Sequence, residues 1–259
     1  MRKTPCLITI LGIVLLAVAA VSAESEEFNW RGRIASGQTI EIKGVNGDIQ
    51  AEEGGSEVEV RALKTGRRSD PSEVQIEVVE HSDGVTICAV YPSSGRPNEC
   101  RPGNGGRNSV KNNDVKVHFT VRVPAGVAFV GRTVNGDVET SHLSSNASAH
   151  TVNGKIEISC DGSGVANTVN GSIYAALGAP FEDDAEFSTV NGSVTLELPG
   201  DVDAEVRASS VNGTIKSDFP LRISGRWGPK SARGTLGSGG PELSVKTVNG
   251  SIKILEGRR

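Results

Sequence analysis

The sequence predicts an all-β protein that folds as a parallel β-solenoid with coils of about 20 residues. Three observations predict this fold. The tripeptide Val-Asn-Gly occurs seven times, apolar and polar residues alternate on both sides of it, and the composition is rich in Val, Ile and Thr, with 32 Gly and a single Met.

Residues 1–23 predict a secretory signal peptide. Arg2 and Lys3 precede an apolar stretch from Leu7 to Val21, and Val21-Ser22-Ala23 is a small-residue cleavage pattern. The stretch is shorter than the roughly 20 residues that a membrane-spanning helix needs. We therefore expect an extracytoplasmic protein (periplasmic, secreted or at the cell surface) without a transmembrane span. Cleavage lowers the formal charge from −4 to −6, because Arg2 and Lys3 leave without any acidic residue. This sign argues against a nucleic-acid partner.

Residues 24–123 predict an irregular β-rich region that holds one copy of the motif. The alternating runs at 73–79 and 115–121 indicate strands. Between them, residues 92–113 are rich in Ser, Gly, Pro, Arg and Asn, and we expect an exposed, poorly ordered loop there.

Three cysteines remain after cleavage. Cys88 and Cys100 lie 12 residues apart in a protein predicted to be exported, so a disulfide between them is predicted. Cys160 is then left over, and we interpret it as a buried thiol rather than a catalytic one.

Residues 124–259 contain the repeat itself, which we expect to be continuous with the region before it. Successive Asn residues of the motif differ by 89, 18, 17, 21, 21 and 37 positions. We interpret 232–236 (Ala-Arg-Gly-Thr-Leu) as a degenerate copy that divides the last gap. Asn and Gly both tolerate positive φ, so each Asn-Gly marks a sharp corner between two strands. These corners are Asn46-Gly47, Asn135-Gly136, Asn153-Gly154, Asn170-Gly171, Asn191-Gly192, Asn212-Gly213 and Asn249-Gly250.

An extended antiparallel hairpin repeat is the alternative, because Asn-Gly is also a common hairpin turn. It would produce an open sheet of more than about ten strands with an uncovered apolar face. A solenoid buries that face between its own strands, and stacking also explains why Thr recurs before Val-Asn-Gly. The solenoid is therefore preferred. The last strand, 251–255, would lie at the free end of the stack, followed by charged residues that discourage edge pairing.

The recurring Thr-Val-Asn-Gly-Ser-Ile, the phrase at 236–243 (Leu-Gly-Ser-Gly-Gly-Pro-Glu-Leu) and the signal peptide resemble the bacterial putative-adhesin family of β-strand-repeat proteins, a family of unknown function. The segment 121–127 is similar to it as well. The resemblance covers most of the mature chain. It implies a right-handed β-helix-like fold and defines no catalytic residues.

The polar and reactive side chains of this sequence give little indication of an active site. No nucleophile elbow, phosphate-binding loop or His-Glu-x-x-His motif is present, so we expect no catalytic residue, no cofactor and no enzyme. Asp161, Asp183 and Asp203, with Asp184, lie seven to nine residues before Asn residues of the motif, which places them on the edge opposite the corners. Such a column could bind a cation or cleave a glycan, but Asp is also common in turns, and we favour turns.

The sequence thus favours an exported, non-enzymatic β-solenoid that acts as an adhesin-like interaction or scaffold module at the bacterial cell envelope. Its expected partner is an envelope protein or a glycan. The alternative is a β-helical enzyme that acts on polysaccharides through the acidic edge.

Overall fold

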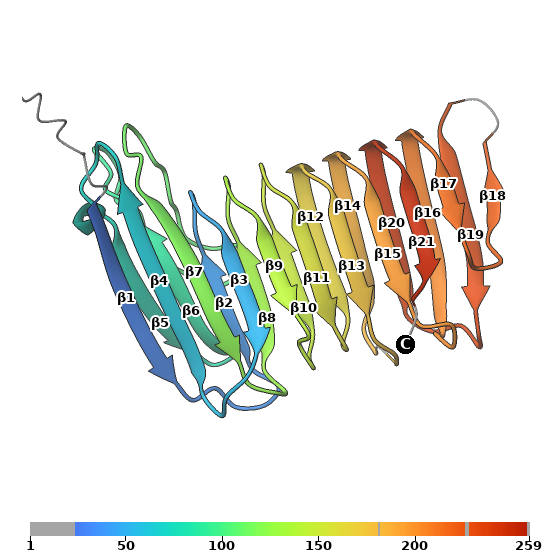
Figure 1. The fold of residues 1–259 in the computed structure, drawn as a ribbon, viewed down its shortest axis with the longest axis horizontal. Helices are drawn as coiled ribbons and strands as arrows, with labels where there is room; N and C mark the ends of the chain where they lie inside the picture. Colours follow the sequence, from blue (N-terminus) through green and yellow to red (C-terminus); the bar gives the residue numbers. More distant parts are fainter. Residues whose placement is uncertain (1–23, 181, 226–227, 258–259) are drawn as a thin grey trace, which may run out of the picture.

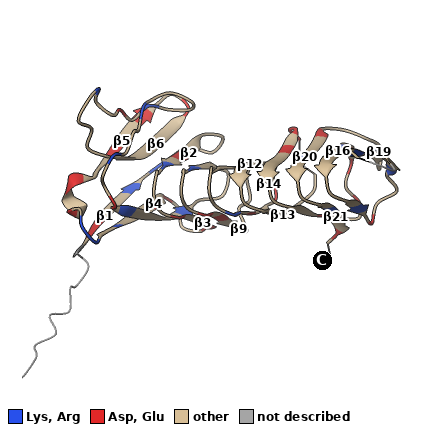
Figure 2. Cartoon of the chain, turned by 90° about the horizontal axis from the view of Figure 1, so that it is seen from above, with Lys and Arg blue, Asp and Glu red and all other residues tan. Residues whose placement is uncertain are grey.

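Two large β-sheets, stacked face to face, run the length of the molecule (Figure 1 and Figure 2). The structure is a computed structural model that describes residues 24–180, 182–225 and 228–257. The predicted signal peptide, residues 1–23, lies outside the described residues. One sheet has ten strands and the other has eleven. A short 3-10 helix, η1 (Pro71–Glu73), is capped by Asp70, and no helix among the described residues is long and apolar enough to span a bilayer.

Each Val-Asn-Gly coil places one strand in the eleven-stranded sheet and the next strand in the ten-stranded sheet. In chain order these strand pairs are β2 (Thr39–Lys43) with β3 (Ile49–Glu53), β8 (Ala128–Arg132) with β9 (Val138–Ser141), β10 (Ala147–His150) with β11 (Ile156–Cys160), β12 (Gly164–Asn170) with β13 (Ile173–Leu177), β14 (Ala185–Asn191) with β15 (Val194–Leu198), β16 (Ala204–Asn212) with β17 (Ile215–Ser217), and β20 (Glu242–Asn249) with β21 (Ile252–Glu256). Neighbouring coils pair in parallel, which confirms the all-β solenoid and rules out the antiparallel hairpin repeat.

The core lies between the two sheets and follows the period-two pattern. Within one coil, Ala185, Phe187 and Thr189 point inward from β14, and Val194 and Leu196 point inward from β15. Each of these side chains is at most 4% exposed, whereas the alternate residues face solvent. Because both sheets present one apolar face to each other, the coils enclose their own core without a second layer.

The last coil of the chain is not the last coil of the stack. Strand β20 lies between β14 and β16, and β21 lies between β15 and β17, as the red strands among the orange ones show in Figure 1. The expectation that the final strand forms a free end is therefore wrong. The predicted copy at 232–236 is wrong too: this segment lies within β19 (Lys230–Leu236), which pairs antiparallel with β16 and forms no corner.

The N-terminal region contains an eighth coil without the motif. Strand β6 (Gly84–Val90) pairs in parallel with β2, and β7 (Lys116–Val123) pairs in parallel with β3. The corner between β6 and β7 is occupied by residues 91–115. Residues 92–113, which we call the corner loop, therefore stand at the same edge of the molecule as the Val-Asn-Gly corners.

Antiparallel strands cover the two ends of the stack. At the N-terminal end β4 (Val58–Gly66) pairs with β7, β1 (Glu24–Gly32) pairs with β4, and β5 (Gln75–His81) pairs with β6. At the other end β19 covers β16, and β18 (Arg222–Ser224) follows it. These strands end the parallel stacking, except that β17 is itself the edge strand of the ten-stranded sheet at the second end.

Candidate functional site at the Val-Asn-Gly edge

The seven asparagines of the motif form a continuous ladder along one edge, which we call the corner edge. In the order of the stack they are Asn46, Asn135, Asn153, Asn170, Asn191, Asn249 and Asn212. Each side-chain amide donates to the Oδ1 atom of the preceding asparagine, at 2.8 or 2.9 Å. Since each interior amide both donates and accepts, the ladder ties neighbouring coils together.

A hydroxyl residue precedes six of the seven Val-Asn-Gly copies and links the coils a second time, whereas Gly44 precedes the first copy. Thr168 Oγ1, for example, donates to the carbonyl oxygen of Gly154 in the preceding coil at 3.1 Å. Thr133, Thr151, Thr189, Thr247 and Ser210 make the equivalent bond. All six side chains are buried, so the hydrogen bond satisfies a polar group that would otherwise be costly to bury. This contact explains the recurrence of Thr in the repeat.

The glycine of the motif is required by close approach. A Cβ atom built on Gly171 would lie less than 3.0 Å from the carbonyl oxygen of Gly154, and the glycines of the other stacked corners meet the same obstacle. From the sequence we expected positive φ to explain these corners, but this explanation does not hold for most of them. Among these glycines only Gly47 has a positive φ (122°), and none of the motif asparagines has one. The tight approach brings the coils close enough for the ladders to form.

A third row of polar contacts lies two positions after the asparagines. Here a side-chain oxygen accepts the backbone N–H of the equivalent residue in the next coil, as Asp48 does from Asp137 at 2.9 Å and Ser193 does from Ser251 at 3.2 Å. These acidic and hydroxyl side chains therefore stabilise the stacking of the corners.

The valine of the motif points outward and makes the corner edge partly apolar. The exposed valines, in the order of the stack, are Val134, Val152, Val169, Val190, Val248 and Val211. Their exposed fractions range from 37% to 44%, whereas Val45 in the first coil is 8% exposed. We call these six residues the valine stripe.

The corner loop is exposed, and covalent and polar contacts tie it to the rest of the molecule. Cys88 and Cys100 form a disulfide with a Cα–Cα distance of 5.7 Å. The side-chain amide of Asn98 donates to the carbonyl oxygens of Tyr91 and Ser109 at 2.8 and 2.9 Å. Within the loop, the backbones of Glu99 and Arg107 form an isolated antiparallel β-bridge. The Tyr91 hydroxyl, donating to Val115 at 2.8 Å, closes the base of the loop.

Lys43 docks the corner loop onto the sheet. Its Nζ atom donates at 2.6, 2.5 and 3.1 Å to the carbonyl oxygens of Arg101, Gly103 and Gly105. Beside it, the buried Glu41 carboxylate accepts from Gly103 N at 2.8 Å and from Arg132 Nε at 2.8 Å. Burial and the nearby Arg132 charge lower the pKa of Lys43, and Glu41 partly opposes them. Sequence reasoning missed this group, because nothing in the sequence shows that the loop folds over β2.

His150 lies next to this charged group and stays neutral near neutral pH. Burial, reinforced by the positive charge of Arg132, lowers its pKa to about 4, although Glu41 acts in the opposite direction. Its Nδ1 atom lies 3.4 Å from the side-chain amide nitrogen of Asn167. His150 therefore acts as a polar packing residue in a row that joins three coils.

The carboxylates of the opposite edge lie in the turns between coils. Asp183 accepts from the side chain of Asn146 at 2.9 Å. Asp184 accepts from the backbone N–H of Glu242 at 2.7 Å, and Asp203 accepts from that of Ser238 at 2.6 Å. Asp161 N donates to the carbonyl oxygen of Leu143 at 2.8 Å. Among the described residues, no group of three or more His, Cys, Asp or Glu side chains could hold a metal ion.

Cys160 is a free, buried cysteine, 3% exposed, in strand β11. Burial raises the pKa of its thiol to about 12, so the reactive thiolate is scarce at neutral pH. This environment fits a packing role.

A family model described as Toastrack DUF4097 matches residues 33–255. The chain belongs to this family. The match confirms the repeat family that the sequence resembles, and it includes all seven corners and the corner loop of this Toastrack chain. No curated protein matches it.

Solved structures that are similar to this chain include three from different bacteria. A putative cell adhesion protein from Clostridium sporogenes is 8% identical, with a TM-score of 0.47 over 90% of this chain and 100% of that one. A putative adhesin from Bacteroides fragilis is 13% identical, with a TM-score of 0.39 over 88% and 97%. A putative lipid binding protein from Parabacteroides distasonis is 14% identical, with a TM-score of 0.24 over 91% and 97%. None of these similarities assigns a function to this chain.

Proposed function

We propose that the protein is an exported, non-enzymatic interaction or scaffold module at the bacterial cell envelope, with an adhesin-like role. Export is supported by the signal-peptide pattern of residues 1–23 and by the Cys88–Cys100 disulfide, a bond typical of oxidising compartments. The partner is an envelope protein or a glycan that contacts the corner edge.

The valine stripe is the observation that carries this proposal. The stacked coils repeat at about 4.8 Å, so six valines form a straight apolar line of roughly 24 Å from the first to the last. Single exposed apolar residues are common on proteins, but a continuous row of them marks a surface that contacts something else. The hydrogen-bonded ladders fix the spacing of the row, so the surface is presented in a rigid form.

The alternative of a polysaccharide-acting enzyme receives no comparable support. Asp183, Asp184 and Asp203 already accept hydrogen bonds from side-chain or backbone groups of the turns. We therefore assign these carboxylates to turns and propose binding rather than catalysis.

The test compares binding to isolated bacterial envelopes by the wild type and by the variant Val152→Ser/Val169→Ser/Val190→Ser. Serine preserves the corner geometry and removes the apolar surface. The matched control is Leu63→Ser/Ile223→Ser, which removes exposed apolar side chains (36% and 47% exposed) away from the corner edge. We expect the triple variant to lose envelope binding and the control to keep it. Absence of binding by the wild type, or equal binding by all three proteins, would contradict the proposal.

A further inference from the structure

Charge is unevenly distributed along this acidic chain. The corner loop carries four basic residues, Arg96, Arg101, Arg107 and Lys111, and one acidic residue, Glu99, for a net charge of +3. Since the whole chain has a formal charge of −4, the remainder carries −7. The loop is therefore a compact basic region on a protein that otherwise repels anions.

Most of this basic charge is available to a ligand. Arg101 pairs with Glu99 at 2.8 Å. Arg96, Arg107 and Lys111 are exposed and take part in no ion pair with another described residue. These side chains lie close to a backbone that the disulfide, Lys43 and Asn98 hold in place. A braced loop loses little conformational entropy on binding, so its charges are better prepared for a ligand than those of a flexible tail.

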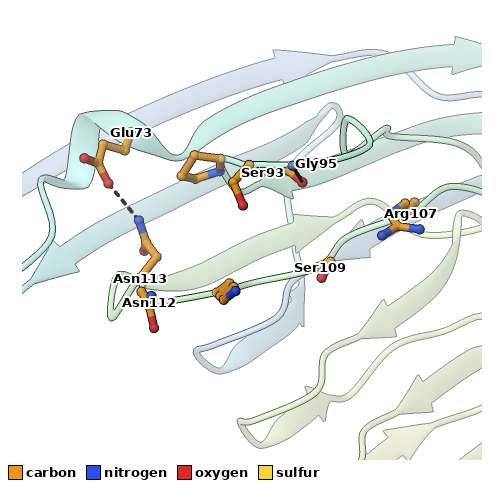
Figure 3. Close-up of a pocket in the computed structure, with 10 residues that line it drawn as sticks. Glu73, Ser93, Gly95, Arg107, Ser109, Asn112 and Asn113 are labelled. Atoms are coloured by element: carbon orange, nitrogen blue, oxygen red, sulfur yellow. Dashed lines mark hydrogen bonds between the residues drawn. The ribbon is translucent and has the colours of Figure 1, made fainter.

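The surface of the loop contains three hollows, and Arg107 lines all of them. The largest, about 640 Å³, lies between the loop and η1, and Figure 3 shows its lining. The other two have volumes of about 350 and 180 Å³. The smallest is also lined by Arg132 and by Val134, the first member of the valine stripe. The smallest hollow thus adjoins the first exposed Val-Asn-Gly corner.

The lining of the largest hollow is rich in groups that bind hydroxyls. Ser93, Ser94, Ser109, Asn112 and Asn113 contribute hydroxyl and amide side chains, alongside Arg107 and Lys111. Asn113 is held by a hydrogen bond to Glu73 at 2.8 Å, which is drawn in Figure 3. Asn112 has a positive φ of 54°, an uncommon conformation for a residue other than glycine.

We propose that the corner loop binds an acidic glycan, a polysaccharide that carries carboxylate or sulfate groups. Arg107 and Lys111 pair with the anionic groups, and the serine and asparagine side chains bond to the sugar hydroxyls. The three hollows are lined by no aromatic side chain, which single-stranded nucleic acids need for stacking, and by no large apolar cluster that would hold an acyl chain. This inference rests on the proposed binding function and names the ligand class.

The experiment uses the full mature protein and soluble probes of known chemistry. Binding of polygalacturonate, dextran sulfate and neutral dextran is measured by titration calorimetry. A single-stranded oligonucleotide and phosphatidylglycerol vesicles are titrated in parallel. We expect polygalacturonate or dextran sulfate to bind in a salt-dependent manner, neutral dextran not to bind, and the oligonucleotide and vesicles to bind more weakly. Absence of binding to both acidic glycans, or tighter binding of the oligonucleotide or the vesicles, would overturn the assignment.

The site is tested with Arg107→Gln/Lys111→Gln against the matched control Lys216→Gln/Lys253→Gln. The control removes the same charge from two exposed lysines that lie side by side on the outer face of β17 and β21. Loss of two exposed charge contacts should weaken glycan binding about tenfold in the loop variant, whereas the control should bind as the wild type does. Equal weakening in both variants would mean general charge attraction and would overturn the site.

The outcome can be separated from that of the proposed function, because the loop variant leaves the valine stripe intact. If the wild type binds envelopes but neither acidic glycan, the glycan assignment alone is wrong. If the wild type binds no envelope component, the proposed function fails as well.

Discussion

Gly171 offers a sharp test of why glycine recurs at the corners. In Gly171→Ala the new methyl group would meet the carbonyl oxygen of Gly154 in the neighbouring coil at less than 3.0 Å, and it would also approach the backbone nitrogen of Lys155. Both obstacles are backbone atoms, so no side-chain rotation relieves the contact. The two coils must separate at this corner.

The expected cost follows from the contacts that separation weakens. Overpacking by one methyl group costs roughly 2 kcal/mol. The backbone hydrogen bonds from Gly154 N to Asn170 O and from Gly171 N to Asn191 O, both 3.1 Å, bind the corner to its neighbours, and weakening them adds about 1 kcal/mol. The total of about 3 kcal/mol corresponds to a decrease in Tm of roughly 9 °C for a chain of this size.

The matched control is Gly54→Ala. Gly54 has no atom within 4 Å of the position of a new Cβ, and its φ lies outside the left-handed region, so alanine should change the stability by less than about 0.5 kcal/mol. Thermal and urea unfolding followed by circular dichroism would measure both variants. A Gly171→Ala protein as stable as the control would refute the explanation by close approach.

Three further predictions concern the corners and the buried titratable groups. Asn170→Ala removes two bonds of the asparagine ladder and Asn46→Ala at its end removes one, so urea unfolding should show about 2 and about 1 kcal/mol of destabilisation; equal effects would contradict a continuous ladder. The thiol of Cys160, whose pKa is about 12, should react with iodoacetamide only after unfolding, and rapid labelling of the native protein at pH 8 would contradict its burial. The pKa of His150 is about 4 when folded and near 6.5 when unfolded, so the unfolded state binds the proton first as the pH falls; stability should decrease from pH 6.5 toward pH 4, and His150→Gln should reduce that dependence.

The repeat made the strands and corners predictable. Alternation around each Asn-Gly predicts one apolar face on each strand, because a strand has a side-chain period of two, and apolar residues of this pattern such as Phe187 and Leu196 are buried. The recurrence of identical corners favoured stacking over hairpins, and the parallel pairing of the coils agrees.

The order of the coils could not be predicted from the same pattern. Every corner carries the same Val-Asn-Gly, so the amide bond between Asn249 and Asn191 is equivalent to the one that Asn212 would make with Asn191 if their coils were neighbours. Local sequence therefore does not distinguish the two orders. The antiparallel pairing of β19 with β16 occupies the outer side of β16 and leaves its inner side for the last coil.

The corner loop was recognised as a loop but not as a corner, because residues 91–115 replace the tripeptide with a long insertion. Its position depends on long-range contacts, such as the one between Lys43 and Gly103, that have no local signature. The net charge of +3 is visible in the sequence and was the signal that could have marked the loop as a candidate site.

The corner edge unites the ladders, the valine stripe and the loop, and its order can be tested by disulfide formation between exposed corners. In adjacent coils Val190 and Val248 are about 5 Å apart, whereas Val190 and Val211 are separated by a full coil at about 10 Å, which exceeds the span of a disulfide. The decisive measurement is oxidation of the two double-cysteine variants. We expect rapid bond formation in Val190→Cys/Val248→Cys and none in Val190→Cys/Val211→Cys, and the reverse result would contradict the order of the stacked corners.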